Sequence, residues 1–488
     1  MSQEAVLGFD VGTSSSKAVL VASDGTVLAS ETCEHAVSRT PDGSVSMDAR
    51  IWFEEFASLA AKLLGSVDVR LAGIGVSGMG PCVALTDSSD APVAQAALYG
   101  VDARARAEIE ELTKRFGADS LLEARDSCLT TQAAGPKFAW FYRHFPQLRE
   151  RESRFYMPAS YVVKQLTGEY VLDRQSASQC TPLYDPQTRE WDKAVWAEIA
   201  PNTLPPTLLW SSELAGTTRV DLGIPGIEAG VPVIAGTIDA WAEQESVGAV
   251  NADELFLMYG TTLFLVGNAD HRVRHASMWG TTGTRPGIYN MAGGLATSGS
   301  LTDWMRQLTG ETDYSVLTKE AAAVPAGSEG LLVLPYFEGE RTPIQDPDAR
   351  GVIAGLRLHH TRGHLYRAVL EGTALAVRHN IEVMEQSGLH IDHIACAGGG
   401  LTADLWPQIV TDVTGRVQTR RKYHIGASLG DAFMVAQTIG MADSIDAWNP
   451  VSKEFVPSAD FDFDALYQDY KALYPSTSGI MHNLAARG

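Results

Sequence analysis

The segments VLGFDVGTSSSKAVLV (residues 6–21) and ELFLMYGTTLFLV (residues 254–266) share one layout. Each has an apolar strand, a turn of glycine with threonine or serine, and a second strand rich in β-branched and aliphatic residues. They stand near the start of the first and second halves of the chain. We therefore expect a duplicated domain, in which two equivalent turns face each other across a cleft.

Working outward, Asp24-Gly25 is a tight-turn dipeptide and Val27–Glu31 resumes the strand pattern, which predicts a three-stranded meander with the first segment. The remaining segments fall into two groups. We expect a strand pair at Leu71–Ser77 and Cys82–Thr86. We expect helices at Ala103–Phe116, Pro136–His144, Gly363–Gln386 and Leu401–Val413.

A chain of 488 residues is long for one domain, so two domains are the natural expectation. The boundary is predicted at Val250–Glu254, because the second strand-turn-strand unit begins there. This gives two domains, at residues 1–250 and 251–488.

The composition excludes several classes of protein. A net charge of −21 argues against nucleic-acid or anionic-membrane surfaces, which need basic patches. Five scattered cysteines, odd in number and without metal-ligand spacing, are typical of reduced thiols in the cytoplasm. The start MSQEAVLGFD does not resemble a signal peptide, and no apolar run reaches the ~18 residues of a membrane span.

The first turn, Gly12–Ser16, is a candidate phosphate site. Its small residues expose backbone amides, and the hydroxyls of Thr13, Ser14 and Ser15 add donors. Asp10, just before the turn, could hold Mg²⁺ through oxygen. A serine-rich surface hairpin is the alternative. The turn is not a Walker P-loop, because Lys17 is followed by a strand and not by a helix.

Two glycine-rich stretches need separate interpretations. Gly73-Ile-Gly75-Val-Ser-Gly78 matches the dinucleotide fingerprint formally, but no helix pattern follows, so we reject it. Gly398-Gly399-Gly400 comes between an apolar strand and a helical pattern, where glycines let a ligand approach the backbone. A plain strand-to-helix turn is the alternative there.

Asp239 is the candidate base. The segment VIAGTIDAWA (233–242) runs from an apolar strand to an acid at the head of a helix, where α/β folds place their chemistry. The carboxylate would take the proton of a sugar hydroxyl as that hydroxyl attacks a phosphoryl group. A helix-capping aspartate is the alternative.

Together these residues resemble the FGGY carbohydrate kinase family over nearly the whole chain. The most specific part is Leu334–Glu371, with Gly-Glu-Arg-Thr-Pro, Ala-Arg-Gly, Gly-Leu, His364-Leu365 and Ala368–Glu371 at the family's spacing. The resemblance implies a duplicated ribonuclease-H-like, actin-like α/β fold that closes around sugar and ATP. It also implies an ATP:sugar phosphotransferase that uses Mg²⁺.

The resemblance implies roles for particular residues. Asp239 would be the base, and Asp10 would lie near Mg²⁺. The phosphates and nucleotide would contact Thr13, Ser14, Ser15, Lys17, Gly260, Thr261, Thr262, Gly299, Gly398, Gly399, Gly400 and Asp404. The sugar would contact Asp239, Asp102, Arg104 and the loop Met79, Gly80 and Pro81.

The sugar side departs from the family pattern. Gly78-Met79-Gly80-Pro81-Cys82 stands where D-xylulose kinases carry Gly-Gln-Met-His-Gly, so an amide and an imidazole that would read hydroxyls are missing. Ala240-Trp241-Ala242 is closer to the ribulose-kinase pattern. We expect a pentulose such as D-xylulose, with ribulose, other polyols and aldonates as alternatives.

Other interpretations remain open at this point. An actin-like or chaperone-like conformational ATPase would share the phosphate turns but would not need Asp239. His359, His360 and His364 favour packing over metal binding, because no carboxylate or cysteine has matching spacing. By analogy with such kinases we expect a small-molecule sugar as partner and a homodimer.

Overall fold

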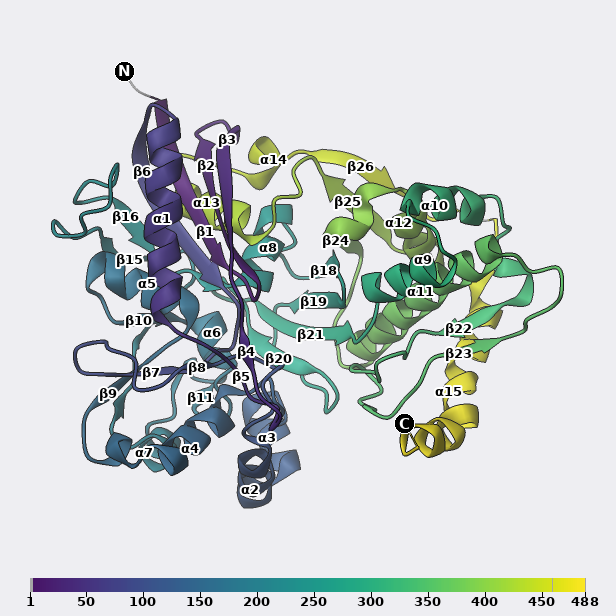
Figure 1. Cartoon of the computed structure of the whole chain (residues 1–488), viewed down its shortest axis with the longest axis horizontal. Helices are drawn as coiled ribbons and strands as arrows, with labels where there is room; N and C mark the ends of the chain where they lie inside the picture. Colours follow the sequence, from purple (N-terminus) through teal and green to yellow (C-terminus); the bar gives the residue numbers. More distant parts are fainter. Residues whose placement is uncertain (1–2, 459, 488) are drawn as a thin grey trace.

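The computed structural model describes residues 3–458 and 460–487. Two lobes lie side by side, the first drawn from purple to teal and the second mainly in green and yellow (Figure 1). Each lobe is built on a seven-stranded sheet. No helix among the described residues is both long and apolar enough to cross a membrane.

The first sheet has the order β15-β16-β6-β1-β2-β3, with β17 also paired to β6. Strand β1 is antiparallel to β2 and parallel to β6, so Asp10 lies opposite Lys17 on one side and beside Ser77 on the other. The predicted meander is confirmed. The bounds are β1 Gln3–Val11, β2 Ser15–Ala22, β3 Val27–Glu34, β6 Val69–Gly78, β15 Leu214–Thr217, β16 Pro232–Ile234 and β17 Thr237–Ile238.

The second sheet has the order β20-β21-β19-β18-β24-β25-β26. Its strands β21-β19-β18-β24-β25 repeat the order and directions of β3-β2-β1-β6-β16, an antiparallel meander followed by two parallel strands. The duplicated, ribonuclease-H-like fold is therefore confirmed. The bounds are β18 Glu254–Tyr259, β19 Leu263–Ala269, β20 Trp279–Thr282, β21 Tyr289–Leu295, β24 His393–Ala397, β25 Val417–Arg421 and β26 Val451–Phe455.

Helix α13 (Ala427–Thr438) belongs to the second half in chain order but packs on the first sheet, against β1 and β6, and against helix α8 (Asp239–Val247). A side chain at Gly75 would place its Cβ 2.1 Å from the Asp431 carbonyl oxygen, and one at Gly8 would lie 1.9 Å from that of Ser428. Gly75 of the rejected dinucleotide motif and Gly8 of β1 thus let α13 approach the sheet closely. Strand β6 ends at Gly78 and no helix follows it directly, in agreement with the rejection of the dinucleotide-binding motif.

One strand prediction was wrong in its pairing. Cys82–Thr86 does contribute a strand, β7 (Ala84–Asp87), but β7 pairs with β9 (Ser153–Tyr156) and not with β6. The reason is the buried segment Met79–Cys82, which carries the chain out of the first sheet. This part of the first lobe is completed by β4 Ser38–Arg39, β5 Val45–Met47, β8 Ala96–Ala97, β10 Val171–Asp173, β11 Tyr184–Asp185, β12 Glu190–Trp191, β13 Thr203–Leu204 and β14 Thr207–Leu209.

The helices cover both sheets, and the second lobe has a large apolar core around α11. The predicted helix at Leu401–Val413 begins later, at Leu405, because residues 399–402 form a 3₁₀ turn. The helices of the first lobe are α1 Arg50–Ser66, α2 Arg106–Phe116, α3 Ala118–Arg125, α4 Ala134–His144, α5 Pro158–Thr167, α6 Arg174–Ser178 and α7 Lys193–Ile199. Those that follow α8, besides α13, are α9 Gly299–Leu308, α10 Tyr314–Ala322, α11 Arg362–Gln386, α12 Leu405–Thr414, α14 Ile445–Trp448 and α15 Phe463–Ala485, and β22 Leu332–Leu334 pairs with β23 Val352–Ala354.

Candidate active site

Asp239 is the first residue of α8 and follows β17 directly. The helix-cap position belongs to Ile238, so the carboxylate of Asp239 is not used as a cap. Its Oδ1 accepts one hydrogen bond, from the amide of Ala240 at 2.7 Å. Because β17 pairs with β6 at Ser77 and Gly78, Asp239 stands just beyond the carboxyl end of β6.

Three carboxylates gather at this edge of the sheet: Asp10 at the end of β1, Asp239, and Glu243 one turn further along α8. Burial raises the pKa of Asp10 well above its usual range, and the charges of Asp239 and Glu243 raise it further. Burial raises the pKa of Asp239 to about 6. Burial and the charge of Asp239 raise that of Glu243 to about 7.

Lys17 is a cation close to two of these acids, Asp10 and Glu243. Its Nζ donates to the backbone oxygen of Ile425 at 2.8 Å, and the charges of Asp10 and Glu243 oppose the lowering of its pKa by burial. Three carboxylates against one ammonium leave an excess of negative oxygen ligands. That donor set fits a hard divalent cation such as Mg²⁺.

Behind Asp10 lies a buried chain of polar groups. Ser77 Oγ is 3.3 Å from Asp10 Oδ1 and 2.7 Å from Oδ2 of Asp431, which comes from α13. Ser77 and Asp431 are both fully buried, and the second oxygen of Asp431 has no partner among the described residues. Burial raises the pKa of Asp431 well above its usual range, so we expect a neutral carboxylic acid that orients Ser77 and, through it, Asp10.

Replacing Asp431 tests this chain. We expect Asp431→Asn to keep kcat within a few-fold, because a neutral amide can still bond Ser77, whereas Asp431→Ala should lower it about 10–100-fold. Steady-state kinetics against Ser77→Ala and the double variant measure the coupling, which should be strongly non-additive. Equal losses in the Asn and Ala variants would show that a charge is needed at this position.

The two glycine turns are both built as the sequence predicts, but their side chains are used differently. Thr13 Oγ1 is bonded to the Tyr99 hydroxyl at 3.0 Å, and Ser14 is exposed. The second turn is tied to the start of α9, since the Gly299 amide donates to Gly260 O at 3.0 Å and the Ser300 amide to Thr261 O at 3.0 Å.

The hydroxyls of Ser298 and Ser300 are buried without partners in the described part of the chain, at the start of α9. A helix N-terminus with free hydroxyls beside a glycine turn favours a phosphate. Sequence reasoning named Gly299 but missed these two serines.

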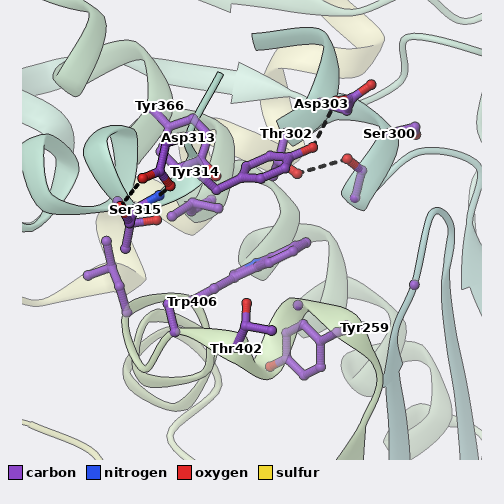
Figure 2. A pocket seen from close by; sticks show the side chains of 18 of the residues that line it. Tyr259, Ser300, Thr302, Asp303, Asp313, Tyr314, Ser315, Tyr366, Thr402 and Trp406 are labelled. Atoms are coloured by element: carbon purple, nitrogen blue, oxygen red, sulfur yellow. Dashed lines mark hydrogen bonds between the residues drawn. The ribbon is translucent and has the colours of Figure 1, made fainter. Parts of the chain in front are cut away.

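A cavity of about 1070 Å³ opens from this turn into the second lobe. Figure 2 shows the ring of Trp406 facing the cavity, with Tyr314 and Tyr366 on the opposite side and Tyr259 near Thr402. Tyr314 donates to Asp303 Oδ1 at 2.8 Å. The cavity is lined by Tyr259, Gly260, Thr261, Gly299, Ser300, Thr302, Asp303, Asp313, Tyr314, Ser315, Thr318, Lys319, Ala322, Tyr366, Leu370, Gly399, Gly400, Thr402, Ala403, Leu405 and Trp406.

The three glycines at 398–400 have different structural roles. Gly399 and Gly400 line the cavity, and no atom lies within 4 Å of where a Gly399 side chain would begin. Gly398 has φ of +101°, and a side chain there would meet the Tyr259 backbone, so a glycine is needed at this position for the turn itself. Asp404 lies outside the lining and pairs with Arg420 at 2.9 Å and Lys453 at 2.6 Å.

Most polar groups of the residues predicted to bind the sugar are hydrogen-bonded within the protein. Asp102 and Arg104 bind each other at 2.7 Å, and Asp102 also accepts from the Val45 amide while Arg104 donates to Ser46. Met79, Gly80 and Pro81 are buried. Within the described residues the Nη1 of Arg104 makes no hydrogen bond, so this predicted pair keeps one nitrogen that can donate to a ligand.

Glu243, Ser77 and Asp431 were missed by sequence reasoning. Glu243 carries one local signal, because it follows Asp239 by four residues and shares its helix face. Nothing local marks Asp431, whose partner is hundreds of residues away in the chain.

The histidine cluster gains a carboxylate that spacing did not reveal. Glu329 Oε2 lies 3.1 Å from His359 Nε2 and 3.5 Å from His364 Nε2. However, His360 Nδ1 accepts from the Arg357 amide and His364 Nδ1 from the Thr361 amide, so in the neutral rings Nε2 carries the proton. Of these two rings only His364 presents its N–H to Glu329, whereas His360 Nε2 has no partner among the described residues. Ligand atoms of Glu329, His359 and His360 lie within 4.8 Å of one another, so the preference for packing over metal binding stays a prediction.

Comparison with protein families gives two adjoining matches. Residues 5–244 match the N-terminal domain and residues 255–438 the C-terminal domain of the FGGY family of carbohydrate kinases. The two matches together span most of the chain.

Known proteins resemble the chain over nearly its full length. A xylulose kinase of Lactococcus lactis subsp. lactis is 28% identical, with 98% of each chain covered. Glycerol kinase 2 of Streptomyces avermitilis is also 28% identical, covering 91% of this chain and 90% of its own. The crystal structure of a xylulose kinase from Rhodospirillum rubrum superposes with a TM-score of 0.90 at 28% identity, covering 98% of this chain and 100% of that one.

Proposed function

Because the chain belongs to the FGGY family of carbohydrate kinases, we propose that it transfers the γ-phosphoryl group of ATP to a hydroxyl of a pentulose such as D-xylulose, with Asp239 as the base. The observation that supports this most is the place of Asp239. It begins α8 at the edge of the first sheet, close to Asp10 and Glu243, and within the described residues its carboxylate accepts a single hydrogen bond.

In the proposed mechanism, different residues bind the nucleotide, hold the metal and accept the proton. The large cavity holds the nucleoside, and the 260–262 turn with the start of α9 binds phosphate oxygens. Asp239 accepts the proton of the attacking hydroxyl. Asp10, with Glu243 nearby, would hold Mg²⁺, which when bound neutralises charge on the phosphates. Lys17 supplies the fixed positive charge on this side.

Closure of the lobes would exclude water from the site. Bulk water would otherwise compete with the sugar for the phosphoryl group, since little covalent chemistry separates hydrolysis from transfer. We therefore expect slow ATP hydrolysis in the absence of sugar. A cytoplasmic location is also part of the proposal. A homodimer stays a prediction, which light scattering of the purified protein would check.

The pentulose is the specific part of the proposal. The xylulose-kinase relatives support it, but a glycerol kinase is equally identical, so identity alone does not select the sugar. The apolar loop Met79–Cys82 departs from the xylulose-kinase pattern. Ribulose, other polyols and aldonates are therefore included as test substrates.

An ADP-release assay over D-xylulose, other pentuloses, hexuloses, pentitols, glycerol and aldonates tests the function. We expect a pentulose to give the highest kcat/KM, at least tenfold above glycerol, since a site built for several hydroxyls loses affinity when they are absent. If no compound raised ADP release above ATP hydrolysis alone, the kinase assignment would fail. A preference for an aldonate or polyol would contradict only the pentulose.

Asp10→Asn tests the metal site. We expect it to weaken binding of Mn²⁺, measured directly by its electron paramagnetic resonance signal, and to raise the Mg²⁺ concentration needed for half-maximal activity about 10-fold or more, because a charged oxygen ligand is lost. Asp404→Asn is the matched control, since Asp404 is paired with Arg420 and Lys453 away from the cavity lining. An unchanged Mn²⁺ signal in Asp10→Asn would contradict the assignment.

A further inference from the structure

A second, much smaller cavity lies between the lobes, with a volume of about 20 Å³. The first lobe contributes the segments 127–133 and 178–181, and the second lobe contributes residues 279–281 of β20. The lobes are bonded here, since the Gly280 amide donates to Asp126 O and the Thr282 amide to Ser178 Oγ. The cavity is thus part of the interface and has room for about one water-sized group.

Three residues that line this cavity each carry a buried polar atom that, within the described residues, has no hydrogen-bond partner. The atoms are Gln179 Nε2 from the first lobe, and Trp279 Nε1 and Thr281 Oγ1 from the second. Buried polar groups are normally paired, because leaving them unpaired costs their hydration. Three in one cavity, contributed from both lobes, indicate a missing partner.

The chemistry of the three atoms defines that partner. The Gln179 amide nitrogen and the Trp279 indole nitrogen can only donate, so the partner must accept two hydrogen bonds. The Thr281 hydroxyl can accept one in return. A hydroxyl group has two lone pairs and one hydrogen, which matches the two donors and one acceptor of these residues, whereas a cation would face two donors.

The cavity is one short helix from the base. Gln175, in α6, accepts a hydrogen bond from Thr237 at 3.2 Å, two residues before Asp239. Gln179 follows Gln175 by four residues, a rise of about 6 Å along a helix. On the opposite side, Thr131 donates to Gly100 O at 2.9 Å, and the neighbouring Tyr99 reaches the Thr13 turn. The cavity is thus connected through α6 to the segment that carries Asp239, and through the contact of Thr131 with Gly100 to the segment that reaches the Thr13 turn.

Resting on the proposed kinase function, we propose that this cavity binds a hydroxyl at the end of the sugar remote from Asp239, and that Gln179, Trp279 and Thr281 select substrates that carry it. The predicted sugar residues Asp102 and Arg104 bind each other instead. The cavity thus supplies the hydroxyl-reading groups that the loop Met79–Cys82 lacks. Both lobes contribute, so the selecting site is complete only where β20 meets the first lobe.

The test combines a variant with a changed substrate. The sugar with the highest turnover is compared with its terminally deoxygenated analogues; for D-xylulose these are the 1-deoxy and 5-deoxy sugars. The analogue that lacks the phosphorylated hydroxyl cannot react, and the other reports on the cavity. We expect wild-type protein to prefer the parent sugar to the reporting analogue at least tenfold in kcat/KM, chiefly through KM.

Thr281→Val removes one hydroxyl at nearly constant shape. We expect it to lower kcat/KM for the parent sugar about tenfold and to leave the value for the reporting analogue unchanged within twofold. Thr281→Ser should restore most of the loss. Thr86→Val is the matched control, because the Thr86 hydroxyl is also buried and without a partner in the described chain but lies outside the cavity lining; it should behave as wild type with both sugars.

Equal losses of Thr281→Val on both sugars would overturn the inference, since the cavity would then hold only a structural water. Equal use of the parent sugar and the reporting analogue by wild-type protein would overturn it as well, without any variant. These outcomes are distinct from failure of the kinase assignment, in which no sugar raises ADP release. Trp279→Phe, which removes the indole donor, provides a second variant if Thr281→Val fails to fold.

Discussion

Asp239→Asn is expected to lower kcat by about 10²–10⁴-fold, the usual contribution of a positioned general base. The amide keeps the size of the side chain but cannot accept the proton of the sugar hydroxyl. ATP affinity, measured by titration calorimetry, should stay within a few-fold, because the cavity proposed to hold the nucleoside lies in the other lobe. Asp239→Ala should give a similar loss.

Retained activity in Asp239→Asn would point to a different base. If Asp239→Asn retained more than about a tenth of wild-type kcat, another group would have to be the base, and Glu243, one helical turn away, would be the first to examine. Asp303→Asn serves as a control within the cavity, since Asp303 contacts Tyr314 and Arg306 and not the cluster at Asp10. It should change KM for ATP more than kcat.

The pH profile follows from the same residue. Burial raises the pKa of Asp239 to about 6, and the base must be ionised to accept a proton. The kcat/KM for sugar should therefore be fully developed above about pH 7 and fall as pH is lowered through about 6. A sugar kinase activity constant down to pH 5 would contradict Asp239 as a base with a raised pKa.

Gly75→Ala is expected to destabilise the protein by about 3 kcal/mol or more, at or beyond the upper end of ordinary overpacking. The new methyl group would lie 2.1 Å from the Asp431 carbonyl oxygen, and a backbone atom of a packed helix cannot move aside as a side chain can. Helix α13 would be displaced from β6, and with it the Asp431–Ser77–Asp10 chain. Both the unfolding temperature and kcat should fall.

Gly65→Ala is the matched control for that substitution. Gly65 lies in helix α1, and no atom lies within 4 Å of the position of the added methyl group. Alanine is the better helix former there, so stability should stay the same or rise by roughly 0.5–1 kcal/mol. Equal effects of the two substitutions on thermal unfolding would show that the contact between α13 and β6 is looser than the structure places it.

The sequence by itself determined the repeated architecture. The strand-turn-strand pattern is local, since alternation of apolar residues and a glycine turn act within about ten residues, and it was found in both halves. The same local logic placed Asp239 at the head of a helix and two glycine turns between strands. It failed at Cys82–Thr86, because strand pairing is not a local property.

Only the tertiary structure decided which polar groups are free to act. Asp102 and Arg104 are as polar as any candidate, yet they bind each other, whereas Gln179, Trp279 and Thr281 carry no sequence signal and have no partner among the described residues. Likewise Asp431 reaches Ser77, and through Ser77 the carboxylate of Asp10, because α13 returns to the first sheet from late in the chain. Pairing and burial depend on contacts between distant segments, so sequence can name candidate groups, but the fold decides which remain available to a ligand.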